Sequence, residues 1–362
     1  MLLGRKYARF RLTRQRIARA ILLVAGLALG GAVCAPTHAC TVGKIDEWPV
    51  RWVAGRYAVV DGTLNGSPIG ILLDTGATRS LILPSAAQRL DLPRRRTRSY
   101  RVFGVGGESP VEIAYIDQFS VGKTVRKGWQ PIVAGAKELA PGIDVILGED
   151  FFLRADVEFD LAHNAIRLLR ATGCDGASLA LAHWGAKGSG EVAMESINEA
   201  APQIIVSVKV NGQPMRALLD SGAPYSMLTT SGAAAAGITP SAPGVYLFGH
   251  SEGLGAQSIE TWVGPIDTFA MGNETIRDTA IHFGDLFKDV AVTGSGGPAA
   301  RGVPRLPQML LGSDFLRTHR VLLSHSQRKM YFYYLGGQVF QPRRPAAPPA
   351  RALPATGDAR SR

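Results

Sequence analysis

Two short segments of this 362-residue chain place an aspartate where the backbone turns sharply: Asp74-Thr75-Gly76 and Asp220-Ser221-Gly222. Each follows an apolar run, residues 71–73 and residues 217–219, which predicts a turn at the end of a buried strand. Two carboxyl groups a few ångströms apart cannot both ionise, so they share a proton. Such a pair activates a water with one carboxylate while the protonated partner donates to a carbonyl oxygen. We therefore expect the two carboxyls to lie within hydrogen-bonding or one-water reach and to catalyse acid–base hydrolysis.

The residues beside the two aspartates have the types that such a site needs. Gly76 and Gly222 allow a tight turn and a close backbone approach, and their N–H groups are expected to hold the carboxylates. Thr75 and Ser221 carry hydroxyls that are expected to bond to the backbone of the opposite loop. A lone Asp-Thr-Gly also describes an ordinary surface turn, so the prediction depends on the two copies together.

An internal repeat surrounds the two aspartates. Residues 61–82 and 207–228 align at a constant offset of 146, with Asn65-Gly66 matching Asn211-Gly212. Asn-Gly supplies the positive φ angles of a type I′ turn, so each copy is predicted to be a β-hairpin whose second strand leads to the aspartate.

Two further pairs of segments extend the repeat. Residues 103–108 and 248–253 are predicted glycine-bearing hairpin tips. Apolar-apolar-Gly blocks close each half at residues 145–154 and 309–317, where the offset has grown to 164. The extra length is expected in the Gly/Pro-rich loop between Val290 and Pro307. Strand-like runs follow each block, over residues 156–169 and 321–334.

Together these motifs resemble the aspartic peptidases of the retropepsin and pepsin kind, over about residues 55–335. The resemblance implies an all-β, bilobal fold of two internally repeated lobes with the active site between them. It implies an aspartic endopeptidase that acts on polypeptides without a cofactor or a metal. The fusion of both halves in one chain resembles bacterial periplasmic members more than retroviral dimers, so we expect a monomer. The site residues that it implies are catalytic Asp74 and Asp220, loop-supporting Thr75, Gly76, Ser221 and Gly222, and substrate-binding flap residues Phe103, Gly104, Gly106, Gly107, Phe248 and Gly249.

One departure from the family pattern bears on activity. Pro224 stands where Thr, Ser or Asp is usual, which removes a side-chain polar group and a backbone N–H near the second aspartate. The alternative function is therefore a non-catalytic peptide-binding or scaffold protein that keeps the peptidase fold.

The chain ends and the composition define the remaining organisation. Seven basic residues among the first 19 precede an apolar run from Ala20 to Val33 and a small-residue site at 37–39. This pattern predicts a signal peptide over residues 1–39. We therefore expect an exported protein, periplasmic or secreted, without stable membrane insertion. The alternative is an inner-membrane anchor over residues 20–35. We expect an N-terminal lobe over 46–181, a linker over 182–190, a C-terminal lobe over 191–337 and a disordered Pro/Ala/Arg-rich tail over 338–362.

Charge and histidine spacing disfavour nucleic-acid and metal binding, and the cysteines leave the presence of a disulfide open. The formal charge of +11 comes from the two ends of the chain, so the body is near neutral and nucleic acid is not an expected partner. The histidines are scattered without the spacing of metal ligands. Cys40 and Cys174 remain after signal removal, and both a disulfide and two free thiols are compatible with the sequence.

Overall fold

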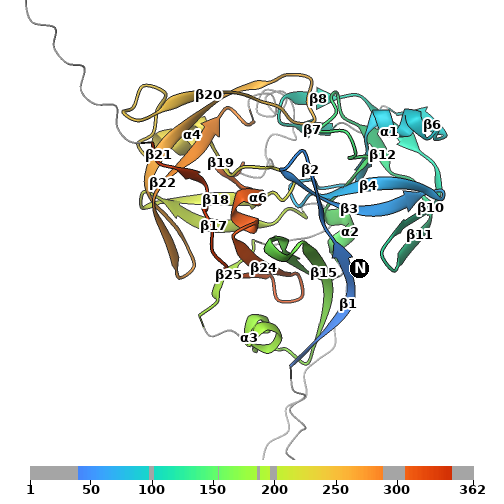
Figure 1. The fold of residues 1–362 in the computed structure, drawn as a ribbon, viewed down its shortest axis with the longest axis horizontal. Coiled ribbons are helices and arrows are strands. Elements are labelled where there is room, and N and C mark those ends of the chain that lie inside the picture. Colours follow the sequence, from blue (N-terminus) through green and yellow to red (C-terminus); the bar gives the residue numbers. More distant parts are fainter. Residues whose placement is uncertain are drawn as a thin grey trace, which may run out of the picture. The chain divides into compact units, whose positions relative to one another are not determined.

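The computed structural model describes residues 40–97, 102–153, 155–185, 188–195, 202–287 and 306–344. The predicted signal peptide and the predicted insertion between Val290 and Pro307 lie largely or wholly outside these residues. No helix within the described ranges is long and apolar enough to cross a membrane. The fold is mostly β, with the strands of each half gathered into a sheet of their own and a third sheet that joins the halves (Figure 1).

The first half forms a ten-stranded sheet whose central members carry the repeat. Asn65 and Gly66 have φ angles of 48° and 83°, so the predicted Asn-Gly hairpin is confirmed. In order of pairing the strands are β11 (Thr124–Trp129), β10 (Ile116–Val121), β3 (Tyr57–Leu64), β4 (Ser67–Leu73), β13 (Val145–Leu147), β5 (Leu81–Ile82), β12 (Ile132–Ala134), β9 (Val111–Ala114) and β6 (Arg94–Arg96), with β2 (Arg51–Val53) on β3.

The second half repeats this plan in an eight-stranded sheet. Asn211 and Gly212 have φ angles of 48° and 79°, which confirms the second hairpin. The order is β20 (Tyr246–Ser251), β21 (Ile259–Met271), β17 (Ile205–Val210), β18 (Gln213–Leu219), β23 (Met309–Leu311), β19 (Met227–Thr229), β22 (Glu274–Gly284) and β26 (Gln341–Pro342).

The closing blocks lie directly beside the strands that lead to the aspartates. β13 runs parallel to β4 with Leu147 opposite Leu73, and β23 runs parallel to β18 with Leu311 opposite Leu219. All four of these leucines are buried. The end of each aspartate-bearing strand is therefore fixed on a packed, apolar base, as the sequence predicts.

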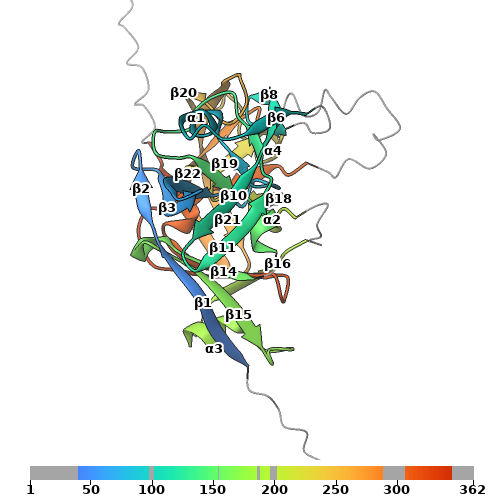
Figure 2. The ribbon, with the colours of Figure 1, turned by 90° about the vertical axis from the view of Figure 1, so that its right-hand side faces the viewer.

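A six-stranded sheet contains strands from both halves of the chain. β14 (Asp156–Asp160) pairs with β24 (His319–Ser324), with Val157 opposite Leu323 and Phe159 opposite Val321. β1 (Thr41–Pro49) and β15 (Ala165–Thr172) continue the sheet on one side of this pair and run side by side in Figure 2. β25 (Lys329–Tyr334) and β16 (Gly190–Ala193) continue it on the other. The sequence predicts most of these strands but not that they form one sheet.

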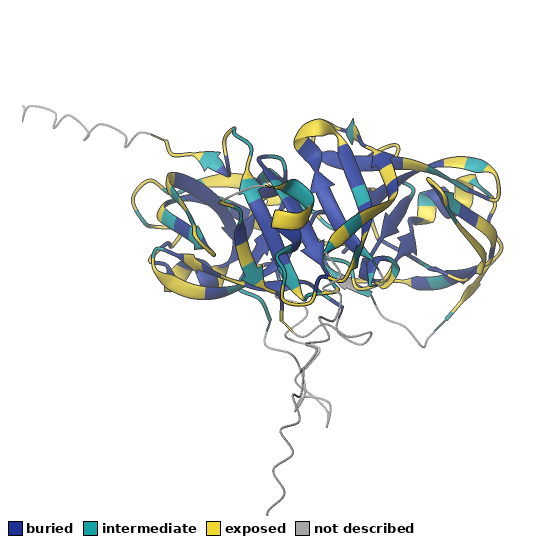
Figure 3. Cartoon of the chain, turned by 90° about the horizontal axis from the view of Figure 1, so that it is seen from below, coloured by how far each residue is buried: buried dark blue, intermediate teal, exposed yellow. Residues whose placement is uncertain are grey.

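A two-stranded hairpin and short helices complete the described fold. Buried residues follow the strands of both halves, and exposed ones gather in the turns and hairpin ends (Figure 3). The hairpin is β7 (Val102–Gly104) with β8 (Gly107–Ser109), and the helices are α1 (Pro84–Arg89), α2 (Glu149–Phe152), η1 (Leu161–His163), α3 (Leu179–Trp184), α4 (Thr230–Ala235) and α6 (Ser313–Leu316).

The expected boundaries of the tail and of the first lobe need correction. Val339 and Phe340 are buried, Phe340 packs edge-on against Phe269, and β26 pairs with β22. Residues 338–344 are therefore part of the second half, because the side chains of Val339 and Phe340 pack into its core. At the other end β1 begins at Thr41, five residues before the expected start, and a disulfide joins Cys40 to Cys174.

Candidate active site

Asp74 and Asp220 stand at equivalent points, one residue past β4 and one residue past β18. The backbone N–H of Asp74 donates to the carbonyl of Leu147 at 3.0 Å, and that of Asp220 donates to Leu311 at 2.9 Å. Each aspartate is thus fixed by the closing block of its own half, so the two loops present their carboxyls with the same backbone geometry.

The two carboxyl groups meet. Asp74 and Asp220 hydrogen-bond to each other through their side chains, which confirms the expected distance between them. Burial raises the pKa of the Asp74 carboxyl, and burial together with the charge of Asp74 raises the pKa of the Asp220 carboxyl further. The pair therefore retains a proton into conditions where an isolated aspartate would be ionised.

The glycines after the aspartates let the opposite carboxyl approach. A Cβ atom at Gly76 would lie 2.6 Å from Cγ of Asp220, and one at Gly222 would lie 2.5 Å from Cγ of Asp74. The N–H groups of Gly76 and Ala77 donate to Oδ1 of Asp74 at 2.9 and 3.1 Å. Any larger residue at either glycine would separate the two carboxyls.

Thr75 and Ser221 tie the two loops together across the approximate twofold axis. Oγ1 of Thr75 donates to the carbonyl of Leu219 at 2.8 Å, and Oγ of Ser221 donates to that of Leu73 at 2.7 Å. Each hydroxyl also accepts from the other residue's backbone N–H, at 3.0 and 3.1 Å. Both side chains are buried, so the four hydrogen bonds give the expected rigid base for the dyad.

Pro224 does not remove a hydrogen bond that the first loop makes. The N–H groups that hold Asp220 come from Gly222 and Ala223, which precede the proline. In the first loop they come from Gly76 and Ala77, which precede the equivalent residue Thr78. The proline therefore leaves the set of amide donors to the second carboxylate the same as the set to the first.

A second layer of support lies beneath each loop and was not predicted. Ser80 donates through its N–H and its hydroxyl to Asp150, both at 2.7 Å, and Ser226 makes the same two bonds to Asp314 at 2.9 and 2.6 Å. The hydroxyls in turn accept from the N–H of Gly148 and Gly312. The repeat carries the signal: both serines stand six residues after the aspartate of the dyad, and both acids stand two residues after the closing glycine.

The first predicted flap is the hairpin of β7 and β8, with Val105 and Gly106 at its turn. Gly106 and Gly107 have φ angles of 90° and 100°, which only glycine adopts at low cost. The carbonyls of Val105 and Gly106 accept from the N–H groups of Gly255 and Gln257 at 3.0 and 2.9 Å. The tip of this hairpin therefore contacts the second half directly. The side chain of Phe103 lies outside the described residues.

The second flap is longer than predicted. Phe248 and Gly249 lie within β20 at an irregularity of the ladder, and the connection between β20 and β21 is residues 252–258. The strands continue through His250 and Ser251, which pair with Glu260 and Ile259. The contact with the first flap is consequently made by Gly255 and Gln257, which lie beyond the predicted hairpin tip at residues 248–253.

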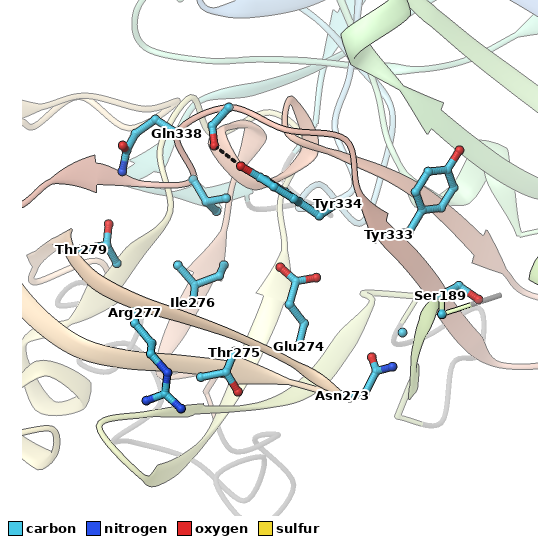
Figure 4. Close-up of a pocket in the computed structure, with 14 residues that line it drawn as sticks. Ser189, Asn273, Glu274, Thr275, Ile276, Arg277, Thr279, Tyr333, Tyr334 and Gln338 are labelled. Carbon is cyan, nitrogen blue, oxygen red and sulfur yellow. Dashed lines mark hydrogen bonds between the residues drawn. The ribbon is translucent and has the colours of Figure 1, made fainter. Parts of the chain in front are cut away.

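A cavity of about 650 Å³ lies elsewhere in the second half (Figure 4). Its lining includes Glu274, Tyr333 and Tyr334, and the Tyr334 hydroxyl donates to the carbonyl of Gly337. Neither aspartate of the dyad lines it. Within the described parts of the chain no group of three or more His, Cys, Asp or Glu side chains is arranged to hold a metal ion.

Comparison with known proteins agrees with this geometry. A family model described as aspartyl protease matches the chain twice, over residues 60–151 and 206–315. Each match runs from the hairpin before an aspartate to the helix after a closing block. No match to a curated protein was found.

Proposed function

This chain belongs to the aspartyl protease family, and from that premise we propose that it is an aspartic endopeptidase in which Asp74 and Asp220 activate a water molecule against a peptide bond. The observation that carries the proposal is the hydrogen bond between two partly buried carboxyls whose pKa values are both raised. Thr75, Gly76, Ser221 and Gly222 are the residues we assign to supporting the loops.

The reaction follows from the shared proton. The ionised carboxylate accepts a proton from the attacking water while the protonated carboxyl donates to the carbonyl oxygen of the peptide. The tetrahedral intermediate then collapses as the amine leaving group takes a proton from the dyad. The backbone amides that hold Asp74 and Asp220 keep the carboxyls aimed at one water throughout the cycle.

We assign substrate binding to the space between the dyad and the two flaps. An extended peptide there gains affinity from main-chain hydrogen bonds and specificity from side-chain pockets. Because the flap tips bond to each other through Val105, Gly106, Gly255 and Gln257, these contacts must open for a polypeptide to enter.

Replacing each aspartate tests the function. We expect Asp74→Asn and Asp220→Asn each to lower the cleavage of a proteome-derived peptide library by about a hundredfold to ten-thousandfold, because each removes one partner of the acid–base pair. Asp61→Asn is the matched control, since Asp61 has a side chain that is 74% exposed and pairs with Arg51 on the surface. Cleavage fragments are identified by mass spectrometry.

The same experiment decides against the alternative. In a non-catalytic peptide-binding protein, wild type and both variants would leave the library intact and would bind peptides equally well. A library that the wild type leaves intact between about pH 3 and pH 8 would reject the peptidase assignment.

We further propose that the protein is exported and acts as a monomer. The Cys40–Cys174 disulfide is typical of oxidising compartments, and one chain supplies both aspartates. Because the sulfur of Cys40 is bonded to Cys174, it is not available for a lipid anchor. Mass spectrometry of the protein purified from its host should give a mature chain that begins at Cys40. An N-terminus at Met1 would favour the inner-membrane anchor instead.

A further inference from the structure

Glu149 is a buried carboxylate that the proposed reaction does not use. It opens α2 directly after Gly148, and its side chain is 0% exposed. Its backbone N–H donates to the carbonyl of Ala77 at 2.9 Å, so it lies immediately beneath the first catalytic loop.

The equivalent position in the second half carries a different side chain. Ser313 opens α6 directly after Gly312, and its backbone N–H donates to the carbonyl of Ala223 at 2.8 Å. Its hydroxyl then donates to the carbonyl of Ser221, also at 2.8 Å. By the repeat, the carbonyl equivalent to that of Ser221 belongs to Thr75. An ionised Glu149 has no proton to donate there, so the two loops are supported by different chemistry.

A histidine from the other half of the chain pairs with Glu149. Nε2 of His325, which follows β24, lies 3.2 Å from Oε2 of Glu149, and Nδ1 lies 2.9 Å from the carbonyl oxygen of Ala155. Both ring nitrogens thus face acceptors, so with an ionised Glu149 both carry hydrogen and the ring is an imidazolium. The His325 side chain is only 6% exposed. Oε1 of Glu149 has no hydrogen-bond partner within the described part of the chain.

We propose that Glu149 and His325 form a proton-linked ion pair that positions the first catalytic loop and sets the charge beside Asp74, with Glu149 as a positioning residue. The proposal rests on the proposed function only for its kinetic consequence. The other charged groups that act on the pair are Asp74 and Asp150 at Glu149, and Asp156 at His325.

Burial at Glu149 works against the ion pair, whereas the raised pKa of His325 favours it. Burial raises the pKa of the Glu149 carboxyl, with the nearby charge of Asp74 adding to the effect. Burial opposes a charged imidazole at His325, but the hydrogen bond and charge of Glu149 outweigh it and raise the pKa of His325. The interaction is reciprocal, so an ionised Glu149 also makes the proton of the dyad harder to remove.

Three variants test the kinetic consequence. Glu149→Gln removes the charge of the pair, and we expect kcat to fall about tenfold to a hundredfold with a smaller change in KM, because the residue whose backbone N–H holds the carbonyl of Ala77 loses its ionic partner His325. We also expect the alkaline limb of the pH–rate profile to move toward acid by about half a pH unit or more, because the dyad then holds its proton less tightly. Glu149→Ser copies Ser313 and should restore much of kcat while keeping the shifted limb.

Glu274→Gln is the matched control. Glu274 accepts from Nε2 of the fully buried His319 at 2.8 Å, and Nδ1 of His319 faces the carbonyl of Phe315. A second contact between a carboxylate and a histidine thus lies at the other end of β24. This control should keep the wild-type pH profile. An equal shift in Glu274→Gln, or a wild-type kcat and profile in Glu149→Gln, would overturn the proposal. If Glu149→Gln does not fold, the profile of Glu149→Ser decides.

A measurement without activity separates this proposal from the peptidase assignment. In the NMR spectrum of histidine-labelled protein, the His325 ring should stay protonated to a higher pH in wild type than in Glu149→Gln. An unchanged His325 titration rejects the ion pair even in an active enzyme. A shifted titration in a protein that cleaves no peptide keeps the pair and rejects the peptidase.

Discussion

Ala77 and Ala223 follow Gly76 and Gly222 and bring methyl groups, not hydroxyls, to the edge of the dyad. A hydroxyl there would donate a hydrogen bond to the ionised carboxylate and lower its pKa, whereas a methyl group offers none. Their backbone N–H groups do donate to Asp74 and Asp220, but burial outweighs them and the pKa of both carboxyls stays raised.

We therefore predict a bell-shaped pH–rate profile with its maximum at about pH 4.5 to 6.5, with both limbs belonging to the coupled pair. Activity is lost in acid when the pair takes a second proton, and lost in base when it gives up the shared one. The raised pKa values of the two carboxyls move both limbs of the profile to higher pH. Replacing both alanines by Thr should move the profile toward acid. A wild-type maximum below about pH 3 would contradict the argument.

At this scale the sequence predicts the residues that repeat and misses those that do not. The sequence predicts four site residues because two copies of the motif at one offset rarely arise by chance: Asp74, Thr75, Asp220 and Ser221. The Glu149–His325 pair could not be predicted, because its partners differ from their equivalents in the repeat and lie 176 residues apart. Ser80 and Ser226 are an intermediate case. Their equivalent positions are visible in the repeat, but their hydrogen bonds to Asp150 and Asp314 are known only from the fold.

Among the elements, the two flaps depend on glycine where they meet. A Cβ at Gly106 would overlap the carbonyl of Gln257, and one at Gly255 would overlap Gly106 itself. Val105 packs on the apolar cluster of the second half that includes Leu218 and Leu310, and Leu254 packs on the cluster of the first half. Each tip thus covers the opposite half.

We predict that Gly106→Val lowers peptide hydrolysis about tenfold to a hundredfold, because a branched side chain is strained at a φ of 90° and prevents the tips from meeting. Gly43→Ala is the control, since a Cβ at Gly43 meets only the carbonyl of Arg170 at 3.9 Å. Wild-type turnover in Gly106→Val would mean that this hairpin is not a catalytic lid.

The last described strand supports a second prediction at this scale. A chain that ends at Gly337 lacks β26 and the buried Val339 and Phe340, so Phe269 loses an aromatic neighbour. We expect its free energy of unfolding to be about 3–5 kcal/mol lower than that of a chain ending at Arg344, measured by denaturant titration. Phe340→Ala in the longer chain should reproduce about half or more of this loss. Equal stability of the two truncated chains would mean that residues 338–344 do not stabilise the second half.

For the whole molecule, the sequence predicts two repeated lobes but not the sheet that joins them. Periodicity marks residues 156–160 and 321–324 as strands, yet a strand pattern does not say which edge it meets. The pairing of β14 with β24 depends on the approximate symmetry that also brings Asp74 to Asp220. The same limit applies to Cys40 and Cys174, whose pairing could be decided only once β1 lay beside β15.

The pairing of β14 with β24 also has a consequence for the order of synthesis. The first half leaves the ribosome with one edge of β14 uncovered, and that edge stays open until β24 has been made. We expect a chain ending at Gly185 to self-associate through this edge, which size-exclusion chromatography with light scattering would detect as a concentration-dependent dimer. In such a dimer each copy contributes one aspartate. The full chain carries both partner strands covalently, so dilution does not separate them.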